Sequence, residues 1–187
     1  MAFFNFNNIK VAGIACAVPS NEVKTESYKH LFGDEEVEKF MEMTGVRASH
    51  RTSEHQTCSD LGYRAASELL AKKQIDPNEI GALIFSSHSP DYRRPSTAFV
   101  LQYRLGLHKE AVCYDISLGC SSLVVGMQTL ASIMNTSDMK YGLLFVGDTA
   151  GKSVYPNDRS SAMLFGEAGA VMLLEKTDNE SDKIKAL

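Results

Sequence analysis

Short apolar runs separated by polar stretches recur along the chain, and their lengths are typical of strands. Residues 9–18 are rich in β-branched and small side chains and end at a proline, which predicts a first, largely buried strand. Further buried strands are expected at residues 82–86, 111–116 and 143–146. Residues 162–174 hold two glycines between apolar runs, which indicates a bent strand or a strand pair.

Helical patterns fill the segments between these strands. Residues 34–43 begin with an aspartate cap and acidic side chains, as the dipole of a helix favours. Leucines and alanines at helical spacing after Thr57 predict an amphipathic helix over residues 58–73. Another helix is expected at residues 96–105, and an uncharged one begins at about Cys120. Because helices alternate with strands, we predict an α/β domain whose mostly parallel sheet is covered on both faces.

Two stretches lack a periodic pattern. Residues 47–56 are polar and carry two of the five histidines, so we expect a solvated loop there. The charged tail after residue 175 is typical of a linker that leaves a domain. The expected organisation is one domain over residues 1–175 and the start of a linker over residues 176–187, toward a second domain that this sequence does not contain.

The composition is that of a folded protein. The 187 residues include 44% hydrophobic and 22% charged side chains, and the formal net charge is −4. No basic run is present, so we expect neither nucleic acid nor a membrane surface as a partner. The N-terminal segment lacks the pattern of a signal peptide, which predicts a cytoplasmic protein.

Residues 116–137 raise the question of a membrane span, because these 22 residues carry no formal charge. A helix of about 20 apolar residues is long enough to cross a bilayer. Half of this segment is polar or small, however, which does not suit a helix that faces lipid. We therefore interpret it as a helix buried inside the protein.

The four cysteines match neither a zinc-binding pattern nor a disulfide framework, so we expect free thiols, no metal and no cofactor. Cys120 follows Gly119 at the turn between a strand and the uncharged helix. The amides and dipole of a helix start favour a thiolate, and they can also hold the oxyanion that forms when it attacks a thioester. The alternative for Cys120 is a small buried residue in a crowded turn. Cys16, Cys58 and Cys113 are interpreted as structural.

A nucleophilic thiol needs a base or a charge partner nearby. Four of the five histidines lie in polar surface stretches or at helix ends. His88 differs because it follows the carboxyl end of an expected strand, where parallel sheets place their ligands. We nevertheless favour a surface-loop role for His88, and the sequence alone assigns no Cys-His pair.

Several short motifs occur in one order along nearly the whole chain. They are Thr44-Gly45-Val46-Arg47, Ser59-Asp60-Leu61, Pro95-Ser96-Thr97-Ala98, Asp115-Ile116-Ser117-Leu118-Gly119-Cys120-Ser121, Asn157-Asp158-Arg159-Ser160 and Leu164-Phe165-Gly166-Glu167-Ala168-Gly169-Ala170. Together they resemble the motifs of β-ketoacyl-acyl-carrier-protein synthase III, an enzyme family with the thiolase-like fold. The resemblance implies one α-β-α half of that architecture, the N-terminal one.

In that family a cysteine accepts an acyl group, and a carbanion from decarboxylated malonyl-acyl carrier protein then attacks the acyl-cysteine. The resemblance implies that Cys120 is the acyl acceptor, that Arg159 lines the coenzyme A entrance and that the protein forms a homodimer. The alternative for Arg159 is a solvated surface arginine. It also implies an acyltransferase of fatty acid biosynthesis that takes acyl-coenzyme A or acyl-acyl carrier protein as donor. The family's histidine and asparagine belong to a second half absent from this sequence, so the isolated chain is not expected to complete the condensation.

Two segments depart from the family. Residues 39–43 stand where well-known members grip coenzyme A with a tryptophan and an arginine, and Arg94 replaces an aromatic residue near the acyl pocket. An ester-forming acyltransferase of the same fold uses the same cysteine and remains an alternative, as does a non-catalytic dimerisation module. Hydroxymethylglutaryl-coenzyme A synthase is disfavoured, because residues 86–90 lack the acidic residue that it would need.

Overall fold

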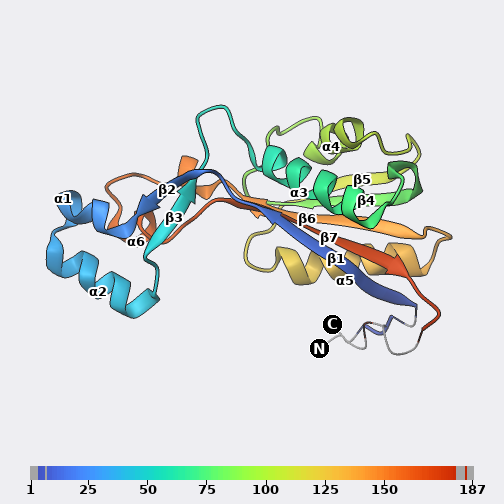
Figure 1. The fold of residues 1–187 in the computed structure, drawn as a ribbon, viewed down its shortest axis with the longest axis horizontal. Coiled ribbons are helices and arrows are strands. Elements are labelled where there is room, and N and C mark those ends of the chain that lie inside the picture. The colour runs from blue at the N-terminus through green and yellow to red at the C-terminus, as the bar shows by residue number, and fades with distance from the viewer. Residues whose placement is uncertain (1–3, 7, 180–183, 185–187) are drawn as a thin grey trace.

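The computed structural model describes residues 4–6, 8–179 and 184, and a five-stranded sheet forms its centre (Figure 1). In sheet order the strands are β1 (Ile9–Ala17), β7 (Ala168–Lys176), β6 (Tyr141–Asp148), β4 (Ile80–Ser86) and β5 (Val112–Ile116). Strand β4 is parallel to β5 and β6, whereas β7 is antiparallel to β1 and β6. The sheet is mixed, so the prediction of a mostly parallel sheet is wrong.

The antiparallel direction of β7 follows from the path that the chain takes after β6. Residues 149–167 contain only a 3₁₀ turn, Ala150–Lys152, and the short helix α6 (Arg159–Ala162). This segment leaves and re-enters the sheet at the same end, because no helix carries it back across a face of the sheet (Figure 1). Residues 162–174 predicted a bent strand or a strand pair, but only the part from Ala168 onward is a strand, the single strand β7, which contains Gly169. Ala162 belongs to α6.

Helices cover both faces of the sheet, as expected. Helices α3 (Cys58–Lys73) and α4 (Thr97–Leu105) pack on one face, and α5 (Ser122–Asn135) packs on the other (Figure 1). Strand β4 shows the consequence, because Leu83 and Phe85 join the core under α3 and α4 while Ile84 joins the core under α5. A central strand that is buried on both faces has no polar alternation.

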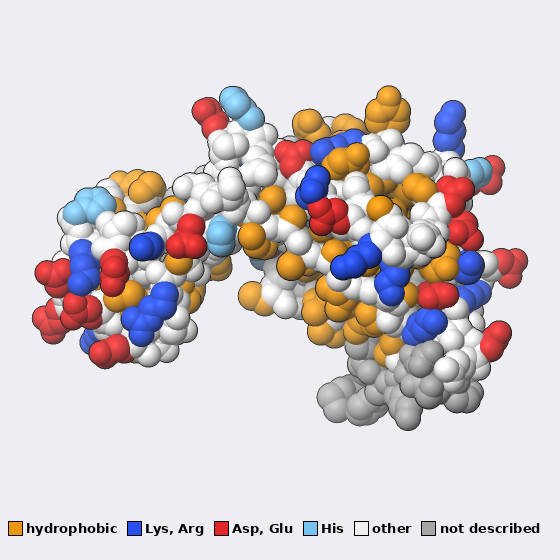
Figure 2. All heavy atoms as spheres, viewed as in Figure 1, with side chains coloured by type: hydrophobic (Ala, Val, Ile, Leu, Met, Phe, Trp, Pro, Cys, Tyr) orange, Lys and Arg blue, Asp and Glu red, His pale blue; other side chains and the backbone are white. Residues whose placement is uncertain are grey.

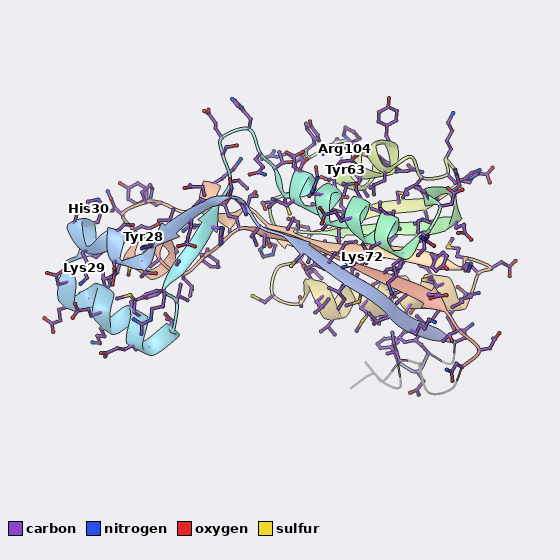
Figure 3. All side chains as sticks on the ribbon, in the orientation of Figure 1. Tyr28, Lys29, His30, Tyr63, Lys72 and Arg104 are labelled. Carbon is purple, nitrogen blue, oxygen red and sulfur yellow. The ribbon has the colours of Figure 1, made fainter. Side chains whose placement is uncertain are left out.

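Helix α3 begins as predicted, after Thr57. The Thr57 side chain accepts a hydrogen bond from the Asp60 amide, and the Asp60 carboxylate accepts one from the Thr57 amide, which forms a capping box. Arg104 of α4 donates to Asp60 at 2.8 Å and lies over the Tyr63 ring at 4.4 Å (Figure 3). Burial opposes ionisation of Asp60, but the Thr57 amide and Arg104 outweigh it and lower the pKa of the carboxyl. These contacts fix α3 against α4.

A small lobe lies beyond one end of the sheet (Figure 1). It contains the antiparallel strands β2 (Asn21–Lys24) and β3 (Ala48–Arg51), the 3₁₀ turn Thr25–Tyr28 and the helices α1 (Lys29–Phe32), α2 (Asp34–Thr44) and α6. Val37, Met41 and Met163 form its core. Strand β3 corrects the expectation that residues 47–56 are entirely loop. The predicted aspartate cap is also wrong, because α2 follows Gly33 without a side-chain cap.

Two elements are more exposed than the sequence predicted. Strand β1 is an edge strand, and 62% of Ile14 is exposed, so β1 is not largely buried. Helix α5 buries one face against β4 and β6 but exposes Leu123, Val124 and Val125, so it is not buried all round. Within the described part of the chain, every helix is too short or too polar to cross a bilayer.

The end of the chain only partly tests the expected linker. Strand β7 ends at Lys176, and the Thr177 amide then donates to the Asn8 carbonyl. Most of the remaining residues of the expected linker, 180–183 and 185–187, lie outside the described residues. The domain boundary at residue 175 therefore stays a prediction.

Replacement of Gly169 by alanine tests the close approach of β7 to α3. A Cβ atom at position 169 would lie 2.7 Å from the Gly62 nitrogen and 2.7 Å from the Leu61 Cβ, which is closer than such atoms pack. We expect Gly169→Ala to lower the free energy of unfolding by about 1–3 kcal/mol, measured by urea denaturation. Gly166→Ala is the matched control, because a Cβ there meets nothing closer than 3.6 Å. Equal stability of the two variants would contradict this packing.

Candidate active site

The carboxyl ends of the three parallel strands β4, β5 and β6 meet at one edge of the sheet, on the side of the small lobe (Figure 1). Strand β5 leads into the turn that carries Cys120, β4 leads into Ser87 and His88, and β6 ends at Asp148. Parallel α/β sheets place their ligands at this edge. The topology thus brings three segments that are distant in sequence into one region.

Cys120 lies in the turn between β5 and α5, two residues before the helix begins at Ser122. The Ser122 amide donates to the Gly119 carbonyl at 2.8 Å, and the Ser122 hydroxyl donates to the Leu118 carbonyl at 2.5 Å. Ser86, at the end of β4, donates from its hydroxyl to Ser122 Oγ at 2.9 Å, and both serines are buried. The hydroxyl pair therefore ties the turn of Cys120 to the central strand.

This turn has the properties that covalent acyl chemistry needs. Cys120 is exposed, so a thioester can reach its sulfur. The first amides of a helix have no acceptor within the helix, and the dipole makes that end positive. Both features suit an oxyanion on an attacked carbonyl.

The other cysteines lack this combination. Burial, together with the negative charge of Asp148, raises the pKa of Cys58 to about 12. Burial raises the pKa of Cys113 to about 11. Both raised pKa values keep these thiols protonated at pH 8. Cys16 is exposed, but it lies on β1, at the opposite edge of the sheet from β5.

The loop after β4 is held in place by Asp148 of β6. Asp148 Oδ1 accepts hydrogen bonds from the amides of His88 and Ser89, at 2.7 and 3.0 Å, and from the hydroxyls of Ser87 and Ser89, at 2.9 and 3.0 Å. The side chain of His88 packs against Gly119, because a Cβ at position 119 would lie 2.8 Å from the His88 Nδ1 atom. The structure therefore places His88 beside the residue that precedes Cys120.

Sequence reasoning singled out the place of His88 after a strand but assigned it to a surface loop. Its side chain is indeed exposed, yet it also contacts the turn of Cys120. The signal that pointed to it was its position at the carboxyl end of β4. The contact itself joins segments about 30 residues apart, so no local pattern contained it.

Arg159 lies in the small lobe, at the start of α6. Asp158 caps this helix by accepting hydrogen bonds from the Ser160 amide and hydroxyl, at 3.0 and 2.7 Å, and from the Ser161 hydroxyl. Arg159 forms an ion pair with Glu36 of α2 and lines a cavity of about 320 Å³ together with Lys39. Acidic side chains gather on this lobe (Figure 2), where α2 begins with three of them. Arg159 and Cys120 thus belong to different parts of the molecule.

Two further cavities adjoin the edge region. One of about 500 Å³ is lined by His88 and, among others, by Asp91, Arg93 and Lys152. Another of about 690 Å³ is lined by polar residues near Arg51 and by none of the residues that form the turn of Cys120. Within the described residues, no group of three histidine, cysteine or acidic side chains is arranged to hold a metal ion.

The chain is similar to known proteins of one family. Residues 114–187 match the family described as 3-oxoacyl-[acyl-carrier-protein (ACP)] synthase III. The chain is 32% identical over 172 residues to a β-ketoacyl-[acyl-carrier-protein] synthase III of Clostridium beijerinckii, covering 92% of this chain and 52% of that protein. The crystal structure of a 3-oxoacyl-(acyl-carrier protein) synthase from Burkholderia xenovorans LB400 superposes with a TM-score of 0.93 at 34% identity, covering 96% of this chain and 51% of that one. The chain spans about half the length of the curated relatives that it matches.

Alkylation of the natural full-length protein with iodoacetamide at pH 8 tests the ranking of the four thiols. We expect Cys120 and Cys16 to react, because both are exposed, and Cys58 and Cys113 to be spared, because burial raises their pKa values to about 12 and 11. Peptide mapping by mass spectrometry measures the extent at each site. The same reaction in urea is the control and should label all four. Faster labelling of Cys58 than of Cys120 in the folded protein would contradict the assignment.

Proposed function

Because the chain belongs to the 3-oxoacyl-[acyl-carrier-protein] synthase III family over about half the length of its relatives, we propose that it is the acyl-accepting part of a condensing acyltransferase. Cys120 is the acyl acceptor. The observation that supports this role is an exposed cysteine at the start of α5, in a turn that buried hydroxyls fix at the carboxyl edge of the sheet. The enzyme acts in the cytoplasm, in fatty acid biosynthesis or in related acyl chain formation.

The proposed reaction begins when the Cys120 sulfur attacks the carbonyl carbon of an acyl thioester. A new bond forms between this sulfur and the acyl carbon, the original carbon–sulfur bond breaks, and the donor leaves as a thiol that carries the proton of Cys120. The amides at the start of α5 stabilise the negative charge on the carbonyl oxygen during the attack. The acyl-cysteine then condenses with the carbanion that decarboxylation of malonyl-acyl carrier protein supplies.

The condensation step needs groups that polarise the malonyl thioester. In relatives of full length these groups belong to the half that this chain does not match, as the family resemblance implies. We therefore assign residues 1–175 to an N-terminal thiolase-like domain and residues 176–187 to the start of a linker. In this assignment the 187 residues form the acyl-enzyme but do not condense it alone.

The proposal includes a homodimer that forms through β5. Strand β5 is the last strand of the sheet, and within the described residues only β4 pairs with it. An edge strand presents unpaired amide and carbonyl groups that a second strand can bind. Pairing of β5 with the same strand of a second copy would continue the sheet across a two-fold axis.

Intact-mass spectrometry of the natural full-length protein tests acyl transfer. After incubation with acetyl- to octanoyl-coenzyme A, or with the corresponding acyl-acyl carrier proteins, we expect one acyl group on the protein and none on Cys120→Ala. Cys16→Ala is the matched control, because it removes the other exposed thiol and should keep the adduct. An adduct that persists in Cys120→Ala, or no adduct on the wild-type protein, would refute the proposed function.

Arg159 is proposed to bind the anionic carrier of the acyl group at the entrance. Its guanidinium is exposed and its partner Glu36 is exposed as well, so an incoming phosphate can compete for it. We expect Arg159→Ala to raise KM for the acyl donor by about 3- to 10-fold and to leave kcat within about 2-fold. Arg64→Ala is the control, because Arg64 forms a comparable exposed ion pair with Glu68 on α3. Equal KM values for the two variants would exclude this role.

A further inference from the structure

The side chain of His88 fills the space beside the Cα of Gly119. A Cβ atom at position 119 would lie 2.8 Å from Nδ1 and 3.0 Å from Nε2 of the imidazole. The left-handed backbone conformation that favours glycine occurs at Gly33, Gly45 and Gly106 but not at Gly119. Glycine at this position is therefore explained by the imidazole that packs on it, and not by the conformation of the turn.

This contact places an imidazole beside the residue that precedes Cys120. Consecutive Cα atoms are about 3.8 Å apart, so the ring that touches Gly119 lies one residue from Cys120 along the turn. His88 and Cys120 are both exposed. Histidine is the side chain most often used to move a proton at neutral pH.

The position of His88 is fixed by its backbone and not by its ring. The His88 amide donates to Asp148 Oδ1 at 2.7 Å, and the amide of Ser89 donates to the same oxygen at 3.0 Å. The Ser89 hydroxyl also accepts a hydrogen bond from the Thr149 amide at 2.7 Å. The loop is therefore anchored to the end of β6, which leaves the ring free to exchange a proton.

Two of the charged groups around His88 are held by other partners. Asp91 and Lys152 line the same cavity, but Asp91 accepts hydrogen bonds from Thr57 and Ser59, and Lys152 donates to the carbonyls of Glu54 and Gln56. Arg93 also lines this cavity and is exposed. On the opposite side, the ring faces the uncharged turn of Gly119.

The other four histidines are placed differently. The rings of His30 and His50 bind the carbonyls of Ser27 and Pro19, at 2.5 and 2.6 Å. The ring of His108 accepts a hydrogen bond from the Glu110 amide at 3.3 Å, and His55 lines the cavity of about 690 Å³. Of the five histidines, His88 is the one whose ring packs against the turn of Cys120.

We propose that His88 is a catalytic residue that transfers the proton during acylation of Cys120, an inference that rests on the function proposed above. When the sulfur attacks the thioester carbon, the thiol proton moves to the unprotonated nitrogen of the imidazole. When the original carbon–sulfur bond breaks, the imidazolium returns this proton to the leaving sulfur. The net reaction transfers the acyl group from one thiol to another, and His88 ends in its initial state.

Single-turnover acylation of the natural full-length protein tests this role. Acetyl- to octanoyl-coenzyme A are the probes, and rapid quenching followed by intact-mass spectrometry gives the rate between pH 5 and pH 9. We expect His88→Gln to slow acylation by about 100-fold at pH 7 and to remove the rise in rate over the range where a histidine loses its proton. Alkylation of Cys120 by iodoacetamide at pH 10, where hydroxide removes the thiol proton, should remain within about 2-fold of wild type.

His55→Gln is the matched control, because His55 is also exposed but lines a different cavity. It should keep the wild-type rate and pH profile. Circular dichroism and urea denaturation verify that the variants are folded, which we expect because the ring of His88 contributes no hydrogen bond among those of the described residues.

The possible outcomes separate the two proposals. If His88→Gln forms the Cys120 adduct at the wild-type rate and with the wild-type pH profile, the role of His88 is overturned while the function of Cys120 stands. If the wild-type protein forms no adduct with any probe, both proposals fail. A slowed acylation together with an equally slowed alkylation at pH 10 would show that His88 only shapes the turn, which also overturns the proton-transfer role.

Discussion

The parallel alignment of β4, β5 and β6 is the constraint on which the rest of the site depends. Parallel neighbours end at the same edge, so the segments after these strands meet although they are far apart in sequence. Had β5 run in the opposite direction, the turn of Cys120 would lie at the far edge, away from Asp148. Strands β1 and β7 pair antiparallel and complete the sheet beyond β6. They bring no site residue to the end of the sheet where β4, β5 and β6 finish.

Two buried hydroxyl groups hold the turn of Cys120 in a fixed position relative to the parallel strands. Ser86 donates to Ser122 at 2.9 Å across the boundary between the sheet and α5, and Ser122 donates to the Leu118 carbonyl. Both side chains are almost fully buried, and each hydroxyl also contacts a backbone carbonyl, Ile116 for Ser86 and Leu118 for Ser122. Removal of either hydroxyl therefore deletes one buried hydrogen bond between the serines, at a cost of about 0.5–1.5 kcal/mol. The turn of Cys120 therefore has little freedom to shift relative to β4, which an attack on a positioned carbonyl requires.

Most individual elements could be predicted from the sequence, because their signals are local. The capping box of Thr57 and Asp60 marks the start of α3, and the apolar run of β4 shows a strand buried on both faces. The direction of β7 and the pairing of β3 with β2 could not be predicted, since both depend on where the chain goes between strands. Ile14 is exposed because β1 is an edge strand, and Val124 is exposed because α5 buries only the face that packs on β4 and β6. The periodicity of the sequence reports neither feature.

The candidate site likewise has one part that could be predicted from the sequence and one part that could not. The place of Cys120 could be predicted because strand, glycine, cysteine and small residues follow each other directly in the sequence. The residue that lies beside this turn, His88, could not be predicted. The reason lies in residues 116–137, which carry no formal charge. A helix without ionisable side chains supplies no titratable partner for its own thiol, so within this chain a proton acceptor for Cys120 has to come from another segment. Of the segments at this edge, the loop after β4 supplies one, because Asp148 holds its backbone while the ring of His88 rests on Gly119. The lack of charge that first suggested a membrane helix thus also means that α5 itself offers Cys120 no ionisable neighbour.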